Sequence, residues 1–466
     1  MAPSNAALVG GVVAFFLSAT FVRLESPFDP VVWEHPTELP ALEGTLSPND
    51  RLLAVEHLHE DDVIAPEAFA EGDDGALYTG LWDGRVVELD ENGENPRDVF
   101  FTGGVVSPAG RDLGSTTGVD YGTRLLHTCH EKAKNKKLTL EDERKCGRPL
   151  GVRWRAGKLY ILDAYHGLFE LDVKAGRAKH LINPCTDKPR PLGEGADNAA
   201  GPMVSAEQTT LPLIFLNDFV FAQDGAILLT DSSWKHPRAL NRREIIDGGA
   251  RGRLLRFEPE SGDLRTVMCG LHFPNGVEID PSGTKLLLVE SLRFRVLEVD
   301  LEALSPESTT KENGQVKDSK AVTSPSLEDA LGFCGEDETL PAGVRVFAGA
   351  LPAGFVDNLV FDEKFGGYVA AVGSKVALPF SPLHLALRMP GVIRDIIGKL
   401  VPIPIIEKIV PKYGMAVVLN LDGTVKESLH DPTGRTPYIS SVHRHSKSGY
   451  VFLGSSVNPY LGRLRL

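Results

Sequence analysis

Residues 216–233 read LNDFVFAQDGAILLTDSS: an Asn-Asp pair, an apolar run, a turn that contains Gly225, and a second apolar run that ends in two serines. Three further segments repeat this order of a carboxylate or amide side chain, an apolar run, a Gly-containing turn and a β-rich strand. They begin at Glu67, Asn275 and Asp357. Self-similarity on this scale is typical of a radially repeated β-architecture. We therefore expect four polar side chains at equivalent places in four repeats of one fold.

Alternating polar and apolar residues, together with β-branched and aromatic content, predict six clusters of strands along the chain. The clusters begin at Glu67, Arg148, Asn217, Asn275, Asp357 and Tyr438. The sequence thus predicts an all-β fold, a six-bladed β-propeller that occupies residues 51–466. The length of the chain does not contradict a single unit, because propellers run long as one domain.

Two segments interrupt the predicted propeller. Residues 305–340 are polar and poor in aromatic residues, which favours a flexible insertion. Residues 379–411 combine apolar residues at helical spacing with several Arg and Lys residues, which predicts an amphipathic helical insertion. Such a segment suits a membrane surface or the roof of a pocket, and a helical pair packed on the propeller is the simpler alternative.

The N-terminal region carries one long apolar run, ALVGGVVAFFLSATFV at Ala7–Val22, which Arg23 follows. A membrane-spanning helix needs about 20 apolar residues, so this run is long enough only if Arg23 snorkels and Leu24 joins it. A cleaved signal peptide is the alternative, although no basic stretch precedes the run. We expect three N-terminal parts: a short tail at 1–6, a transmembrane signal-anchor at 7–24 and a linker at 25–50.

Charge and cysteine content narrow the class of protein. The formal net charge of −14 disfavours nucleic acid as a partner. The five cysteines are too few for a disulfide scaffold and lack the CxxC spacing of zinc sites. Cys129 and Cys146 bracket a Lys- and Glu-rich loop, so we expect one disulfide there and three free thiols.

The polar side chains that open the repeats would meet on one axis if each lies at the inner end of its blade. Carboxylate and amide oxygens are the ligands that a hard cation such as calcium prefers. A turn explains each residue alone better than a metal does, because Asn-Gly and Asn-Asp are common turn formers. Their shared register favours a metal site instead. The predicted Ca²⁺ ligands are Glu67, Asn217, Asn275, Asp357 and Asn358.

Motifs of other enzyme classes are missing from the sequence. It contains no Gly-x-Ser-x-Gly, P-loop or HExxH pattern, which removes the usual nucleophile-elbow, nucleotide-binding and zinc-protease interpretations.

Several segments, in this order along the chain, resemble the strictosidine synthase-like family of six-bladed propellers, which is related to paraoxonases, gluconolactonases and diisopropylfluorophosphatase. The resemblance extends from about Leu24 to the C-terminus, and the insertion at 305–340 departs from the family pattern. The segments that carry it are LESPFDP (24–30), CGRPLG (146–151), DAYHGLFELDV (163–173), GRLLRFEP (252–259), LHFPNGVEID (271–280), SLHDPTGRTPYISSVH (428–443) and YLGRLRL (460–466).

The resemblance implies a single-pass type II membrane protein whose propeller lies in the endoplasmic reticulum lumen or at the cell surface. It also implies arylesterase-like hydrolysis of small esters or lactones, with Asp357 as nucleophile or as base for a water molecule. Leu150 stands where paraoxonases carry a catalytic His, and Ser440 stands where strictosidine synthase carries a Glu, so strictosidine-type condensation is disfavoured. The alternative is a non-catalytic, membrane-anchored propeller that holds a structural calcium ion and binds a partner or lipid.

Overall fold

The structure, a computed structural model, describes residues 30–31, 41–103, 112–115, 120–187, 211–304, 340–341, 343–349, 351, 355–375, 389–401, 405, 408 and 410–466. The expected anchor at 7–24 and all but the last residue of the expected insertion at 305–340 lie outside these ranges. Among the described residues, no helix has the length and apolar character needed to cross a membrane.

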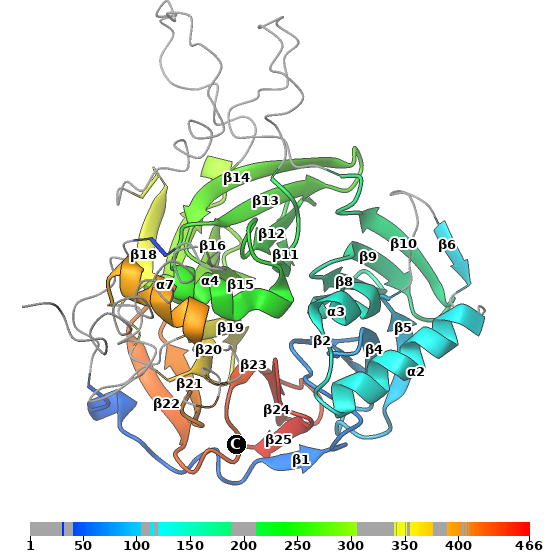
Figure 1. Ribbon diagram of the computed structural model, residues 1–466. Coiled ribbons are helices and arrows are strands. Elements are labelled where there is room, and N and C mark those ends of the chain that lie inside the picture. Colours follow the sequence, from blue (N-terminus) through cyan, green and yellow to red (C-terminus); the bar gives the residue numbers. More distant parts are fainter. Residues whose placement is uncertain are drawn as a thin grey trace, which may run out of the picture.

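Six antiparallel sheets surround a central axis (Figure 1), so the predicted all-β, six-bladed propeller is confirmed. In the first half of the chain the main strands of each blade follow one another from the innermost to the outermost. Blade one holds β2 (Phe69–Glu71), β3 (Leu77–Gly80), β4 (Arg85–Leu89) and β5 (Arg97–Phe101). Blade two holds β7 (Pro149–Arg155), β8 (Lys158–Asp163), β9 (Gly167–Asp172) and β10 (Arg177–Ile182), with β6 (Asp112–Ser115) as a fifth, outer strand. Blade three holds β11 (Leu216–Phe221), β12 (Ile227–Asp231), β13 (Gly252–Glu258) and β14 (Asp263–Leu271).

The second half of the chain continues the same order until the last blade, which takes one strand from the N-terminal region. Blade four holds β15 (Pro274–Ile279), β16 (Lys285–Glu290), β17 (Arg295–Asp300) and β18 (Val344–Ala348). Blade five holds β19 (Phe355–Asp362), β20 (Gly367–Ser374), β21 (Gly414–Leu419) and β22 (Val425–Asp431). Blade six holds β23 (Ile439–Arg444), β24 (Tyr450–Ser455) and β25 (Leu461–Arg465), and β1 (Glu56–Leu58) pairs with β25 as its outer strand.

The hydrophobic cores lie between neighbouring blades. Leu228 of blade three, for example, packs in one buried cluster with Leu286 and Leu297 of blade four. Each sheet therefore buries both faces against its neighbours, which explains why many strands are apolar on both sides rather than strictly alternating. This packing leaves the inner edges of the blades facing the axis.

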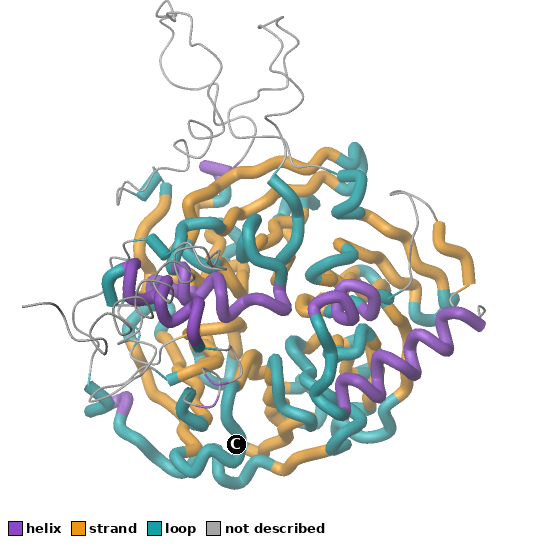
Figure 2. The backbone as a smooth tube through the Cα atoms, viewed as in Figure 1, coloured by secondary structure: helices purple, strands orange, loops and turns teal. Residues whose placement is uncertain are grey.

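The α-helices gather on one face of the propeller (Figure 2), which we call the helix face. Those that the structure describes are α2 (Asp120–Lys134), α3 (Leu140–Cys146), α4 (Asn241–Asp247) and α7 (Gly391–Leu400). The short 3₁₀ segments are η1 (Gly44–Leu46), η2 (Arg238–Leu240), η3 (Ser291–Arg293) and η4 (Glu302–Leu304). The helical character predicted within 379–411 is confirmed for α7.

The Lys- and Glu-rich segment between Cys129 and Cys146 is helical rather than a loop. Helix α3 starts with a capping box, in which Thr139 Oγ1 accepts from the Asp142 amide and the Asp142 carboxylate accepts from the Thr139 amide. A capping box satisfies two free N–H groups at the helix start, which stabilises a short helix. The charges that suggested a loop are spread along this helix and the end of α2.

Candidate metal centre

Four of the five predicted ligands line one cavity of about 110 Å³ at the helix-face end of the axis. They are Glu67, Asn217, Asn275 and Asp357, which come from blades one, three, four and five. In β11, β15 and β19 the ladder register shifts at these residues, between Leu216 and Phe219, between Pro274 and Val277, and between Val356 and Leu359. A β-bulge re-aims a side chain next to a site. The repeated bulges thus explain how equivalent residues of different blades reach one cavity.

Two serines hold the two amide side chains in the same way. Ser232 Oγ donates to the carbonyl oxygen of Pro274 (2.7 Å) and accepts from Asn217 Nδ2 (2.9 Å). Ser291 Oγ donates to the carbonyl oxygen of Val356 (2.6 Å) and accepts from Asn275 Nδ2 (3.3 Å). Each serine therefore connects the amide of one blade to the backbone just before the predicted ligand of the next. The amide oxygens remain as the acceptors.

Glu67 is paired with a buried arginine. Arg148 Nη2 lies 2.5 Å from Glu67 Oε2, and Arg148 Nη1 donates to the carbonyl oxygen of Ala65 (2.9 Å). Burial lowers the pKa of Arg148 to about 10, against the charge of Glu67, so the guanidinium stays positive at neutral pH. The pair fixes one oxygen of the Glu67 carboxylate.

Asp357 is the second carboxylate of the cavity. Burial raises the pKa of Asp357 well above its usual range, and the negative charge of Glu67 adds to the effect. A hydrogen bond from Asn275 and the positive charges of Arg238 and Arg148 oppose it. Two carboxylates held together in a poorly solvated site resist ionising together.

The fifth predicted ligand, Asn358, does not share this cavity. It lines a second cavity of about 280 Å³ farther along the axis, together with Glu71, Glu278 and His443. Burial raises the pKa of Glu278 to about 7. Consecutive residues of a strand point to opposite sides, which accounts for the separation of Asn358 from Asp357.

Arg153 provides a second internal cation on the axis. Its Nη2 lies 2.9 Å from Asp218 Oδ2 and 3.3 Å from the carbonyl oxygen of Val277, and its Nη1 donates to the carbonyl oxygen of Val152 (3.1 Å). These acceptors come from blades two, three and four. Arg153 also lines the second cavity.

The residues of the first cavity fit a calcium ion. Their donors are carboxylate and amide oxygens, the hard ligands that Ca²⁺ takes. Asn275 Oδ1 is buried and has no hydrogen-bond partner among the described residues, and an unpaired buried acceptor costs about 1–3 kcal/mol. Within the described part of the chain, no group of three or more His, Cys, Asp or Glu residues is placed to hold a metal. The cavity holds four side chains that can offer an oxygen to a metal, two carboxylates and two amides.

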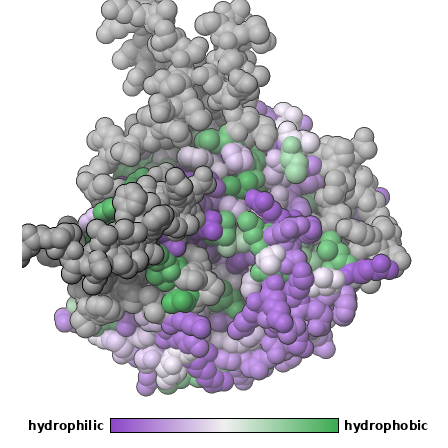
Figure 3. All heavy atoms as spheres, viewed as in Figure 1, coloured by the Kyte–Doolittle hydropathy of each residue, from purple (hydrophilic) through white to green (hydrophobic). Residues whose placement is uncertain are grey.

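The walls of the cavity are apolar, and its polar rim was not predicted. The apolar residues that line it beside the four polar ones are Leu150, Phe215, Phe273 and Phe355. The hydroxyl of Ser440 donates to the carbonyl oxygen of Glu67 (2.8 Å). Apolar side chains lie near the centre of the helix face (Figure 3). The cationic residues at the rim are Arg238 of η2 and Arg242 of α4.

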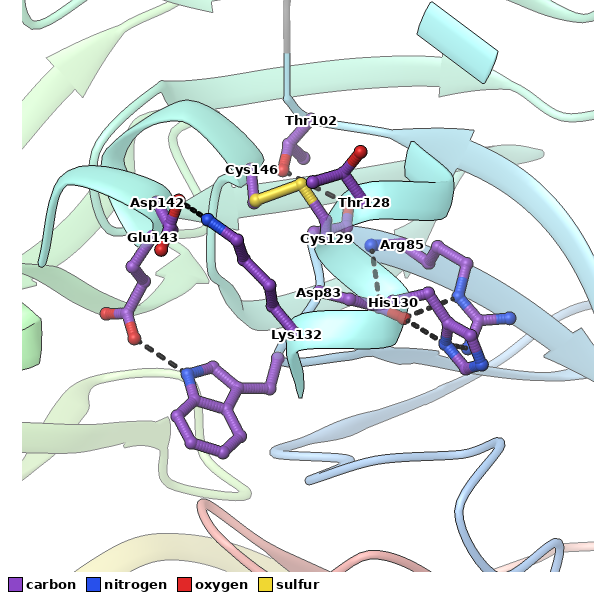
Figure 4. The surroundings of a disulfide bond; sticks show 12 residues. Asp83, Arg85, Thr102, Thr128, Cys129, His130, Lys132, Asp142, Glu143 and Cys146 are labelled. Atoms are coloured by element: carbon purple, nitrogen blue, oxygen red, sulfur yellow. Dashed lines mark hydrogen bonds and ion pairs between the residues drawn. A yellow bond between two sulfur atoms is a disulfide. The ribbon is translucent and has the colours of Figure 1, made fainter. Parts of the chain in front are cut away.

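Glu143 of α3 connects this rim to the disulfide region (Figure 4). Its carboxylate lies 3.0 Å from Arg238 Nη1 and accepts from Trp82 Nε1 (2.7 Å) and from the Tyr165 hydroxyl (2.7 Å). The predicted Cys129–Cys146 disulfide is present. Cys269 is disulfide-bonded as well, so the expectation of three free thiols is wrong; Cys185 is free and exposed.

Comparison with known proteins places this architecture in a class. The chain matches the family models "Strictosidine synthase-like, N-terminal" over residues 44–89 and "Strictosidine synthase" over residues 217–299. Together with the fold, these matches define a strictosidine synthase-like six-bladed propeller whose axial cavity holds carboxylate and amide side chains between apolar walls.

The similarity to individual proteins is more specific. The adipocyte plasma membrane-associated protein of Bos taurus is 30% identical over 453 residues, which cover 97% of this chain and 87% of that protein. The Gallus gallus protein of the same name is 30% identical over 466 residues, with coverage of 98% and 89%. The chain belongs to the adipocyte plasma membrane-associated protein family.

Solved structures show a more distant likeness. A gluconolactonase from Xanthomonas campestris has a TM-score of 0.46 and 14% identity, with 94% of this chain and 98% of that chain covered. The calcium-binding protein regucalcin from Agrobacterium tumefaciens has a TM-score of 0.45 and 12% identity, with coverage of 88% and 92%.

Proposed function

We propose that this protein is a calcium-dependent hydrolase of small esters or lactones whose ion is held at the helix-face end of the propeller axis. The observation that supports this most is the set of oxygen donors in one cavity: Glu67, Asn217, Asn275 and Asp357. A calcium ion bound there would polarise the carbonyl oxygen of an ester. The proposal makes Asp357 the group that attacks the ester carbonyl carbon or takes a proton from an attacking water molecule.

The surroundings of Asp357 suit this role. The aromatic walls formed by Phe215, Phe273 and Phe355 exclude water from the reacting groups and accept an apolar acyl or aryl part of a substrate. Ser374 Oγ also lines the cavity and has no hydrogen-bond partner among the described residues, which leaves it able to bond a substrate oxygen. Leu150 stands where a paraoxonase-like mechanism would need a His base, so base chemistry falls to Asp357.

The test is hydrolysis of phenyl acetate by the full-length chain in detergent, with calcium titrated back after chelation. We expect activity to follow calcium and to fall by about 10²-fold or more in Asp357→Asn and Asn217→Ala. The matched controls are Asp422→Asn and Asn420→Ala, which make the same chemical changes in the β21–β22 turn, away from the cavity. Circular dichroism confirms that each variant is folded.

The opposite result would favour the non-catalytic alternative. If no calcium level produced hydrolysis, but calcium raised the melting temperature of the parent and not of Asp357→Asn, the ion would be structural and the propeller would act by binding. Unchanged turnover in Asp357→Asn would contradict the role given to that residue.

We also propose that residues 7–24 anchor the chain in a membrane as a single-pass type II protein, with the propeller in the endoplasmic reticulum lumen or at the cell surface. The relatives are named for their association with the plasma membrane. The apolar run at Ala7–Val22 supplies the physical basis for an anchor.

A further inference from the structure

Helix α7 exposes an unusual amount of apolar surface. Val392, Ile396 and Leu400 are 65%, 37% and 62% exposed, and Ile393 beside them is 41% exposed. Residues spaced by three and four lie on one side of a helix, so these four form a continuous stripe, which we call the α7 stripe. Among the described residues eight large hydrophobic side chains are exposed, and five of them lie between Val392 and Ile405.

The opposite side of α7 is fastened by one arginine. Arg394 is buried, and its Nη1 donates to the carbonyl oxygens of Ile246 (2.9 Å) and Asp247 (3.2 Å) at the end of α4. Its Nη2 donates to the carbonyl oxygen of Val31, and its Nε to that of Met389 (3.2 Å). Because four backbone carbonyls fix this guanidinium, the α7 stripe has a defined direction, away from the propeller.

The start of the described chain lies in the seam between the same two helices. The amide of Val31 donates to the carbonyl oxygen of Asp247 (3.0 Å), and a side chain at Gly391 would approach the carbonyl oxygen of Pro30 to 3.1 Å. Only five residues lie between Leu24, the end of the proposed anchor, and Pro30. The six Cα-to-Cα steps from Leu24 to Pro30 span at most about 20 Å. An anchor that ends at Leu24 would therefore lie within that distance of Pro30, beside α7.

We propose that the α7 stripe docks on the lipid bilayer that holds the N-terminal anchor, and that the mouth of the axial cavity consequently lies at the membrane surface. The inference rests on the proposed membrane anchorage, but not on the proposed ester hydrolysis. Lys408 and Lys412 are exposed just after α7 and suit the anionic headgroups of a bilayer. Residues Asn241, Arg242, Ile245 and Ile246 of α4 line the cavity, which brings its mouth next to the docking helix.

A second copy of the chain fits the stripe less well than a bilayer. A ten-residue helix is about 15 Å long, and one side of it supplies far less than the roughly 800 Å² per partner of a stable interface. A bilayer needs no such area, because the anchor already brings the helix to the surface.

The test measures the depth of single fluorophores in the full-length chain reconstituted into liposomes. In a Cys185→Ser background, which removes the free exposed cysteine, Val392→Cys and Leu421→Cys carry the same NBD label. Leu421 is the matched control because it is equally apolar and 61% exposed. It lies in the turn between the third and fourth strands of blade five, at the end of the blade opposite to Asp357.

Lipids with brominated acyl chains should lower the emission from residue 392 by about twofold and leave residue 421 unchanged, because only acyl-chain contact permits this quenching. Equal emission changes at the two positions in protein that floats with the liposomes would overturn the docking and leave the anchorage standing. Protein that fails to float would contradict the anchorage itself. The label at residue 392 could instead be shielded from water to the same extent with and without brominated lipids, while the protein sediments as a dimer. That result would assign the α7 stripe to a second copy of the chain and also overturn the proposal.

Discussion

At the residue scale, His430 is held as one neutral tautomer by a chain of hydrogen bonds. Ser428 Oγ donates to the carbonyl oxygen of Thr45 (2.8 Å), so it accepts from His430 Nε2 (2.8 Å). His430 Nδ1 then accepts from the Tyr413 hydroxyl (2.8 Å). Burial, followed by the charge of Lys375, lowers the pKa of His430 to about 4.

This depressed pKa predicts a pH dependence of stability. Below pH 6.5, the pKa of an ordinary His, His430 becomes protonated in the unfolded chain but stays neutral in the folded one. The free energy of unfolding therefore falls as the pH drops from 6.5 toward 4. We expect a loss on the order of 1–2 kcal/mol from this residue between pH 7 and pH 5. The measurement is chemical denaturation of the parent and of His430→Gln at both pH values. An equal loss in both proteins would contradict the assignment.

The sequence predicted four of the polar side chains that line the axial cavity, but not the residues that hold them in place. Asn217, Asn275 and Asp357 can be recognised in the sequence because each stands at the same position of its repeat. Arg148 is only one of 49 Lys and Arg residues in the sequence, and its burial depends on the turn at Ala65 from another blade. Asn358 was grouped with Asp357 because sequence adjacency does not reveal which side of the strand each residue occupies.

At the element scale, the Cys129–Cys146 disulfide fixes α2 to α3 next to the cavity rim. Closing a loop with a sequence separation of 17 residues restricts the unfolded chain and stabilises the fold by about 3 kcal/mol. Lys132 of α2 also reaches Asp142 of α3 (2.5 Å), as Figure 4 shows. The bridge thereby positions Glu143, and through it Arg238.

We expect the double substitution Cys129→Ser/Cys146→Ser to lower the melting temperature by on the order of 5 °C. Trp82 emission should change at a lower temperature than the far-ultraviolet signal, because its indole N–H bonds Glu143 of the loosened helix (2.7 Å). Cys185→Ser, which removes a free exposed thiol, is the control. The same melting temperature for the double variant and the control would contradict a stabilising role.

The pairing of these cysteines was predictable from their spacing, but the helices between them were not. The segment has few apolar residues to mark a helix period, and its helical form depends on the Thr139 cap and on contacts with the propeller. The helical segment at 379–411 was predicted because its apolar spacing is strong. The direction of its apolar side depends on Arg394 and could not be read from the sequence.

At the scale of the whole molecule, the ring of blades is closed by a strand from the opposite end of the chain. Strand β1 pairs with β25 in an antiparallel register, with His57 opposite Gly462. The ring of His57 also stacks on Tyr460 at a centroid distance of 3.6 Å. The number of blades was predictable from repeats, whereas this closure was not, because β1 is too short to show a strand pattern.

Deleting residues 1–59 should therefore open the ring, expose the edge of β25 and lower the melting temperature far more than deleting residues 1–29. A synthetic peptide of residues 41–64 should restore part of the loss in the shorter chain, because it supplies β1 and the buried side chains Leu52 and Val55. Differential scanning calorimetry gives both comparisons. A peptide without effect, together with equal melting of the two truncated chains, would contradict closure by β1.

The arginines on the axis affect how the blades assemble during folding. Arg148 and Arg153 place permanent positive charges beside Glu67 and Asp218, in sites where acidic groups of several blades meet. These internal counter-ions lower the repulsion among the blades as they assemble. The ring can therefore close while the cavity is empty, so folding would not depend on the calcium ion proposed for the first cavity, even in a compartment poor in calcium.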